Sequence, residues 1–338
     1  MSQPRSAPVL LVDLGGTNVR FGVADIASGN PLLPDSIRRY RVAEHESLVA
    51  TARLYLAETG LDVKRAVIAA AGRIVDGETV KVTNNPWAIS ARQTAADLKL
   101  EHVHLVNDFA AQSMAATLLQ DDDLVDVGPA RRMVIGADEE QTFAIVGPGT
   151  GLGVGGLLIR QQRCSVLQTE GGHAGFAAHT AQDIAILGYL NEKYGRVSNE
   201  RLICGQGLVN LYHAIGHSTG AAVADLNPED ITSRAKDNSC PLCTRTVETF
   251  VGIFGSIAGD FVLTLGAWNG VYLAGGLIPV LLPWLERGCF RERFEAKGRF
   301  RDAMEKVPTH AVTHAEPGLL GAAALAVMDS GRSLLPRL

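Results

Sequence analysis

Two short stretches of the sequence set glycines and a threonine between apolar runs, a pattern that suits phosphate binding. The first consists of Gly15, Gly16, Thr17 and Asn18, and the second of Gly149, Thr150 and Gly151. Glycine lets a backbone approach a ligand closely, and N–H groups that point at one spot bind an anion. Taken alone, either stretch is more commonly an ordinary hairpin turn. Because both lie between apolar runs, the pair favours a phosphate site.

Asp13 ends an apolar run and precedes the first glycine turn. A carboxylate beside phosphate is repelled unless a cation lies between them. The functional hypothesis for Asp13 is therefore a ligand of Mg²⁺, reached through water because Mg²⁺ sheds its waters reluctantly. The alternative is an aspartate that caps its own turn.

Asn107 and Asp108 follow the apolar run 102–106, which has the pattern of a buried strand. Open parallel sheets bind their ligands at the carboxyl ends of strands, where this pair would lie. Asp108 is a candidate base that accepts the proton of a substrate hydroxyl, and Asn107 would orient that hydroxyl. The alternative is turn chemistry, in which Asn-Asp is common.

Further polar residues gather in short loops that suit a sugar. Glu170 and His173 flank two glycines, and a loop of this kind can present both side chains to several hydroxyls. Di-iron sites present the same Glu-x-x-His spacing on helices, but Gly171-Gly172 forms helix poorly, so we do not expect a metal here. Glu200 adds another carboxylate, although alone it reads as a solvated glutamate. Asn84 and Asn85 add amides, although they also fit a turn before a helix.

Other known patterns are absent or incomplete. The P-loop motif does not occur in the sequence. Residues 151–156 match G-x-G-x-x-G, but the segment that follows them has an extended pattern and not the helix of a dinucleotide site. Cys240 and Cys243 have C-x-x-C spacing, yet no second pair completes a zinc site, and nothing else in the sequence supports a redox or metal role.

The composition is that of a globular protein of 338 residues, with 46% hydrophobic residues and a net charge of −5. No basic run suited to nucleic acid or to anionic lipid occurs. An odd count of five cysteines makes a disulfide framework unlikely in so long a chain. The longest uncharged stretch, 261–285, is interrupted by glycines and prolines and predicts a helix end, a short strand and a new helix near Pro279. We expect a cytoplasmic protein.

Strands and helices alternate along the N-terminal third, which predicts a largely parallel α/β sheet covered on both faces. Strands are expected at 9–13, 19–25, 65–72 and 102–108, and helices at 47–60 and 90–100, the second with Ser90 as its N-cap. The segment 142–160 repeats the opening unit of strand, glycine turn and strand. Longer helices are expected at 181–194, 206–216, 244–268 and 317–328, the last packing back on the first domain.

The ordered set of motifs resembles bacterial ATP-dependent glucokinases of the proteobacterial type, within the hexokinase/actin-like superfamily. The motifs are "VDLGGTNVRFGVAD", "TNNPWAIS", "VNDFAAQSMA", "GPGTGLGVG", "TEGGHAGFA", "ERLICGQGLVNLY", "YLAGGLIP", "KGRF" and "PGLLGAAALA". The resemblance implies a two-lobed, ribonuclease H-like fold with an interdomain cleft. It implies a small domain at 1–110, completed by the helix at about 317–338, and a large domain at 111–316.

The same resemblance implies roles for particular residues. The stretch from Asp13 to Asn18, with Gly149 and Thr150, would hold the phosphates of ATP, and Gly275 and Gly276 would lie against the adenosine. Asp108 would be the base for the 6-hydroxyl of glucose. The other hydroxyls would be bound by Asn107, Glu170, His173 and Glu200, with Asn84 or Asn85 assisting. MgATP, glucose and a homodimer are implied; a structural zinc is not, because the cysteine-rich motif of related kinases is missing.

Overall fold

The computed structural model describes residues 7–82 and 85–335. Its first sheet has the strand order β3-β2-β1-β4-β8. The strands are β1 Val9–Leu14, β2 Asn18–Ala24, β3 Arg38–Arg41, β4 Arg65–Ala70 and β8 His102–Asn107. β1 and β2 form an antiparallel hairpin, whereas β1, β4 and β8 run parallel. The hairpin and the parallel strands that the sequence predicts are therefore confirmed.

The second sheet repeats this arrangement, with the order β12-β11-β10-β13-β14-β9. The strands are β9 Leu124–Asp126, β10 Glu140–Pro148, β11 Leu152–Arg160, β12 Arg163–Gln168, β13 Gly270–Leu273 and β14 Thr309–Val312. Again the hairpin β10–β11 is antiparallel and is followed by the parallel strands β13 and β14. The expected repeat of strand, glycine turn and strand is confirmed, and it extends to the neighbouring strands. β9, at the sheet edge, was not expected from the sequence.

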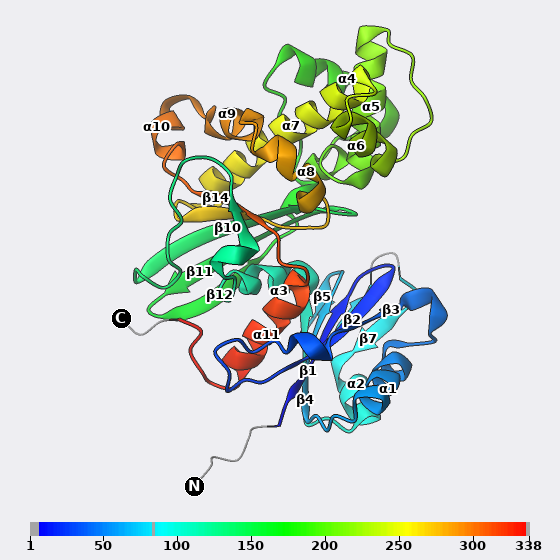
Figure 1. Cartoon of the computed structure of the whole chain (residues 1–338), viewed down its shortest axis with the longest axis vertical. Helices are drawn as coiled ribbons and strands as arrows, with labels where there is room; N and C mark the ends of the chain where they lie inside the picture. The colour runs from blue at the N-terminus through cyan, green and yellow to red at the C-terminus, as the bar shows by residue number, and fades with distance from the viewer. Residues whose placement is uncertain (1–6, 83–84, 336–338) are drawn as a thin grey trace.

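Most of the helices lie beside one sheet or the other (Figure 1). With the first sheet lie α1 Leu48–Thr59 and α2 Ala91–Leu98; with the second lie α4 Ala181–Tyr194, α5 Gly205–Thr219, α6 Pro228–Lys236, α7 Pro241–Leu265, α8 Ile278–Leu285, α9 Cys289–Glu295 and α10 Arg301–Met304. Local signals set several ends: Ser90 caps α2 as expected, and Gly60 ends α1 in the left-handed conformation. α7 lies three residues earlier than expected, because Cys240 caps its start and Gly266 ends it.

Two helices, α3 Asp108–Ala115 and α11 Pro317–Asp329, lie side by side between the two sheets (Figure 1). They cross so closely that a side chain at Gly321 would collide with the backbone of Ala111. α11 also packs on β1, β2 and β4, which confirms that the last helix returns to the first sheet. α3 follows β8 of the first sheet and α11 follows β14 of the second, so the two helices occupy equivalent places in the repeat.

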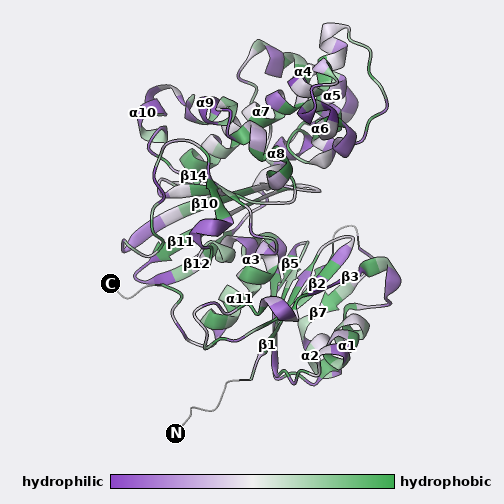
Figure 2. Ribbon diagram, viewed as in Figure 1, coloured by the Kyte–Doolittle hydropathy of each residue, from purple (hydrophilic) through white to green (hydrophobic). Residues whose placement is uncertain are grey.

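Hydrophobic residues line the central strands of both sheets, whereas α10 is largely hydrophilic (Figure 2). Within the described residues, α7 alone is long and apolar enough to cross a membrane by length and composition, and 78% of its most apolar window is buried inside the protein. It therefore serves as a core helix. A small third sheet, made of β5 Ile74–Val75, β6 Thr79–Lys81 and β7 Ala88–Ser90, extends from the first.

Candidate active site

Asp108 stands at the start of α3, where the end of β8 turns into the helix. Asn107 is the N-cap: its Oδ1 accepts the N–H groups of Phe109 and Ala110, and its Nδ2 donates to the carbonyl of Gly72 at 3.0 Å. Burial, reinforced by the charge of Asp13, raises the pKa of Asp108 to about 6. Glu170 acts in the same direction. The charges that raise the pKa of Asp108 thus come from both halves of the chain.

The ring of Phe109 fixes the start of α3 on the second sheet. Gly147 of β10 and Gly153 of β11 face each other across the hairpin. A side chain at Gly153 would collide with the Phe109 ring, and one at Gly147 would come within 2.9 Å of it. The two glycines therefore form a slot that only a bare backbone can provide. Since Phe109 follows Asp108 directly, this slot sets where Asp108 stands relative to the second glycine turn.

The first glycine turn closes through a hydrogen bond from the N–H of Gly15 to the carbonyl of Asn18, at 3.0 Å. Asn85 supports it from a distant part of the chain: its Nδ2 donates to the carbonyl of Gly15 at 2.9 Å, and its Oδ1 accepts the N–H of Trp87. Thr17 is exposed at the tip. The neighbouring residue Asn84 lies outside the described residues.

Asp13 forms an ion pair with Arg20, the residue opposite it on β2, at 2.8 Å. Arg20 also lies 2.9 Å from Glu316, just before α11. A side chain at Gly318 would come within 2.6 Å of the Asp13 carboxyl, so the start of α11 lies directly on this carboxyl. Burial raises the pKa of Asp13 above its usual value, although Arg20 opposes the shift.

The second glycine turn lies against the predicted adenosine residues. The carbonyl of Pro148 accepts the N–H of Leu277 at 3.1 Å, and Gly276 is the nearest neighbour of a side chain built at Gly149. Gly275 has a φ of 98°, which favours glycine, and a side chain there would meet the carbonyl of Pro148. The structure therefore brings Gly149 and Thr150 together with Gly275 and Gly276.

Glu200 joins this turn to the predicted sugar-binding loop. Its Oε2 accepts the N–H of Leu152 at 2.9 Å, and a side chain at Gly151 would collide with the carboxylate. Its Oε1 lies 3.8 Å from Nδ1 of His173, whose Nε2 is 4.0 Å from Glu170. The side chains of Glu170 and His173 are mostly exposed. Three of the residues predicted to bind sugar are thus close together.

Comparison with known proteins identifies the family of this chain. The glucokinase family model matches residues 10–329. A glucokinase of Stenotrophomonas maltophilia is 52% identical over 321 residues, which is 95% of each chain. One of Xanthomonas campestris pv. campestris is 50% identical over 329 residues, or 97% of each chain. The chain belongs to the glucokinase family. The resemblance seen in the sequence motifs is therefore confirmed.

The fold agrees with this family assignment. The crystal structure of a glucokinase from an Antarctic psychrotroph matches with a TM-score of 0.84 and 33% identity, and the match covers 95% of this chain and 98% of the other. This chain thus shares its α/β architecture with that glucokinase over nearly its whole length.

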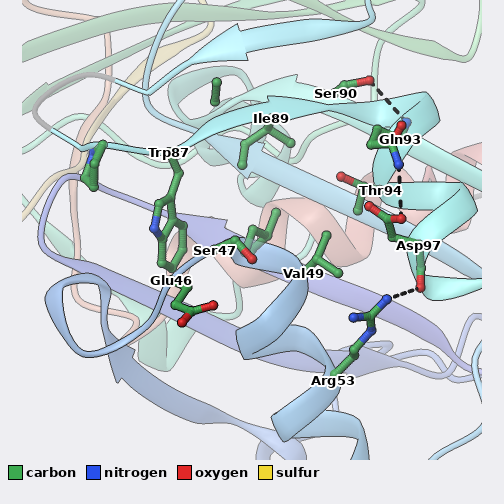
Figure 3. Close-up of a pocket in the computed structure, with 13 residues that line it drawn as sticks. Glu46, Ser47, Val49, Arg53, Trp87, Ile89, Ser90, Gln93, Thr94 and Asp97 are labelled. Carbon is green, nitrogen blue, oxygen red and sulfur yellow. Dashed lines mark hydrogen bonds between the residues drawn. The ribbon is translucent and has the colours of Figure 1, made fainter.

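A separate pocket of this glucokinase-family chain lies away from the candidate site. A pocket of about 550 Å³ lies between α1 and α2, beside Trp87 (Figure 3). Ser47 and Ser90 at its rim cap α1 and α2, and Arg53 donates to the carbonyl of Asp97. None of the residues that line it is a predicted site residue. The pocket therefore adds nothing to the phosphate and sugar groups described above.

Sequence reasoning did not single out Phe109, Arg20 and Gly318, which contact the candidate site residues in the structure. One signal was available for Phe109. Glycines occupy every second position from 147 to 155, and in a hairpin such spacing leaves one face of the strands without side chains. No local signal indicates that Gly318, some 300 residues along the chain, covers Asp13.

Proposed function

We propose that this chain transfers the γ-phosphoryl group of ATP to the 6-hydroxyl of glucose, giving glucose 6-phosphate and ADP, the first step of glycolysis. Membership of the glucokinase family supports the reaction class. The structural observation that carries the proposal is Asp108: a half-buried carboxyl at a helix start, whose pKa is raised by burial and by the charges of the phosphate-turn residue Asp13 and the sugar-loop residue Glu170.

Asp108 acts as the catalytic base. With a pKa raised to about 6 it is ionised at neutral pH, yet it accepts a proton more readily than an ordinary aspartate does. It takes the proton of the 6-hydroxyl as the phosphoryl group transfers. Phe109 is a positioning residue, because its ring in the slot of Gly147 and Gly153 holds Asp108 in place.

The sugar is bound by hydrogen bonds from the other loops. Glu170, His173 and Glu200 accept from or donate to its hydroxyls, and Asn107 uses the remaining capacity of its amide beside its role as N-cap. Asn84 or Asn85 assists; the contact of Asn85 with Gly15 links this segment to the first phosphate turn. Carboxylate acceptors give hydrogen bonds about twice as strong as neutral ones.

The phosphates of ATP bind at two turns, Gly15–Asn18 and Gly149–Thr150, one from each half of the chain, through backbone N–H groups other than those of Gly15 and Gly149, which donate within their own turns. The residues fit Mg²⁺ as a companion of ATP: Asp13 offers carboxylate oxygen, and one oxygen is engaged by Arg20, which favours contact through water. When bound, Mg²⁺ neutralises charge on the phosphates. The described residues contain no cluster of three metal-ligating His, Cys, Asp or Glu side chains.

Adenosine is placed against Gly275 and Gly276. A hollow of about 420 Å³ lies just beyond them, between α6 and α8, with Pro279 and Trp284 on one wall and Thr232 on the other. Apolar walls with a few polar groups suit a purine base and its ribose.

Two lobes would close on these ligands. The small lobe comprises 1–110 with 317–338, and the large lobe 111–316, with the cleft between the two lobes. α3 and α11, which cross between the sheets, support this division because each joins one half to the other. Closure excludes water and aligns the 6-hydroxyl with the γ-phosphate. A cytoplasmic homodimer completes the proposal.

An assay of ADP release across a panel of acceptors tests the proposed function. Glucose should give the highest kcat/KM among glucose, fructose, mannose, N-acetylglucosamine and acetate, with ATP preferred over ADP or polyphosphate as donor. Gel filtration tests the dimer. A preference for acetate, or ATP hydrolysis that no acceptor stimulates, would contradict the assignment.

A further inference from the structure

Cys240 and Cys243 lie together in the first turn of α7, far along the chain from the residues of the proposed kinase site. Cys240 is the N-cap, with extended backbone, and its Sγ accepts the N–H of Cys243 at 3.3 Å. Pro241 follows as the first helical residue. The Cys243 side chain is fully buried, whereas Cys240 is partly exposed, and both are free thiols. The pair thus combines an accessible sulfur with a buried one.

Cys204 provides an internal comparison. It caps α5 in the same way, with its Sγ accepting the N–H of Gly207 at 3.3 Å. Cys204 is buried, and no cysteine follows it in the first turn of α5. Burial raises the pKa of its thiol. A sulfur N-cap in this protein is therefore not by itself a reactive group.

The surroundings of Cys240 favour its thiolate. Burial acts to raise the pKa of Cys240, but hydrogen bonds from Cys243 and from the N–H of Leu242, together with the charge of Arg234, outweigh it and hold the pKa below its usual value. For Cys243, burial and the neighbouring Cys240 raise the pKa to about 12, and Asp230 adds to the shift. The thiolate is the nucleophilic form of cysteine, so attack would begin at Cys240.

We propose that Cys240 and Cys243 form a reversible dithiol–disulfide site that exchanges with small disulfides of the glutathione type. Cys240 thiolate attacks one sulfur of oxidised glutathione and releases the first glutathione as thiolate, which takes up a proton. Cys243 then loses its proton and attacks the sulfur of Cys240, releasing the second glutathione. Two protein thiols are oxidised to one disulfide, and one oxidised glutathione is reduced to two thiols.

The helix geometry permits this disulfide. Residues three apart on an α-helical turn have Cα atoms roughly 5 Å apart. Disulfides accept Cα separations of about 4.4–6.8 Å. Because Cys240 is the cap, only its carbonyl takes part in the hydrogen bonds of α7, where it accepts the N–H of Thr244 at 3.0 Å; the backbone before that carbonyl can adjust while this bond is kept.

Trypsin provides a direct test, since cleavage after Lys236 and Arg245 releases both cysteines in one peptide, 237–245. The folded protein is incubated with oxidised glutathione, and the remaining thiols are blocked with iodoacetamide. After digestion, the mass of the peptide is measured by mass spectrometry. In the wild type we expect an unalkylated peptide that is lighter by two hydrogens than the dithiol form. Dithiothreitol should convert it back to the dithiol form. In Cys243→Ser, which lacks the resolving thiol, Cys240 should retain one glutathione.

The controls separate this site from general thiol reactivity. In Cys240→Ser, which keeps a side-chain cap, we expect Cys243 to stay unmodified because it is buried. Cys204→Ser should behave as the wild type does. The proposal is overturned if peptide 237–245 keeps both thiols at glutathione concentrations that modify Cys164 or Cys289, or if Cys243 reacts equally well without Cys240. Kinase activity plays no part in this readout, so its outcome is independent of the proposed function.

Discussion

The two glycine hairpins share their strand pairing but differ at the second residue pair from the turn. In β1–β2 this pair is Asp13 opposite Arg20, a partly buried ion pair. In β10–β11 it is Gly147 opposite Gly153, with no side chain at all. The repeat therefore has charged side chains beside the first turn, whereas the corresponding positions beside the second turn have no side chains of their own.

The crossing helices compensate for this difference. The second residue of α11 is Gly318, which packs on the carboxyl of Asp13, and the second residue of α3 is Phe109, which fills the slot of Gly147 and Gly153. Each interface thus pairs large groups on one side with glycine on the other, as close packing requires. This difference matters for the proposed chemistry. The charged residues beside the first turn belong to the hairpin itself, whereas the carboxylates beside the second turn, Asp108 and Glu200, belong to other segments of the chain.

The largest effect should come from the residue that the second hairpin positions. Asp108→Asn keeps the size of the side chain but removes the base, so we expect kcat to fall by about 10²–10⁴-fold with little change in the KM for glucose. A raised carboxyl pKa means that the base is lost by protonation as the pH falls. The wild-type kcat/KM should therefore decline below a pH of about 6.

Steady-state kinetics from pH 5 to 8 check both expectations for Asp108. The residual activity of Asp108→Asn should lack the decline near pH 6. A folded variant with nearly normal turnover, or one that keeps the same acidic decline, would remove Asp108 from the role of base.

Filling the slot is the next largest change. Gly153→Ala forces the Phe109 ring to move, and a shift of about 1 Å at a reacting group can cost as much as about 10²-fold in rate. We expect kcat to fall about 10–100-fold while the KM for glucose changes little.

The control for this substitution lies in the first hairpin. A side chain at Gly22 of β2 would find ordinary contacts, at 3.5 Å from Leu319 and Leu32. Gly22→Ala should therefore leave kcat nearly unchanged. If both variants lose kcat equally, or if Gly153→Ala raises KM alone, the slot does not position Asp108.

Substitutions of Glu200 test how the second hairpin depends on a carboxylate from another segment of the chain. Glu200→Ala removes both the proposed sugar contact and the acceptor for the N–H of Leu152, so the KM values for glucose and for ATP should both rise. Loss of a charged hydrogen bond costs about 1.5–3 kcal/mol, or roughly 10–100-fold. Glu200→Gln keeps an acceptor for Leu152 and should raise mainly the KM for glucose.

Glu170→Gln is the matched comparison, because Glu170 has no hydrogen bond to the hairpin among the described contacts. Only its KM for glucose should rise. Equal effects of all three variants on the KM for ATP would show that Glu200 does not connect the sugar loop to the phosphate turn.

The same two interfaces show what the sequence could predict. Hairpins, caps and strand ends depend on local signals, and Asp13 and Asp108 were predicted from their places after apolar runs. Contacts such as Phe109 with Gly153, or Gly318 with Asp13, depend on how distant segments pack, which no local pattern specifies. Short strands such as β9 carry too few residues for a period of two to be recognised. Fold and candidate residues were therefore predictable, but the groups that position them were not.

The smallest expected effect comes from the first hairpin, where charge already fills the interface. Gly318→Ala would gain about 1 kcal/mol from helix propensity, but the added methyl must push the Asp13 carboxyl aside, and such overpacking costs about 1–3 kcal/mol. We expect the clash to prevail, because the carboxyl is held by Arg20 and cannot simply rotate away. The KM for MgATP should rise roughly tenfold at most, equivalent to about 1.4 kcal/mol, with kcat nearly unchanged. Steady-state kinetics and thermal unfolding of Gly318→Ala, with Gly22→Ala as the control, measure both effects. If Gly318→Ala is more stable than the wild type and its KM for MgATP is unaltered, Asp13 tolerates displacement and does not organise the phosphate turn.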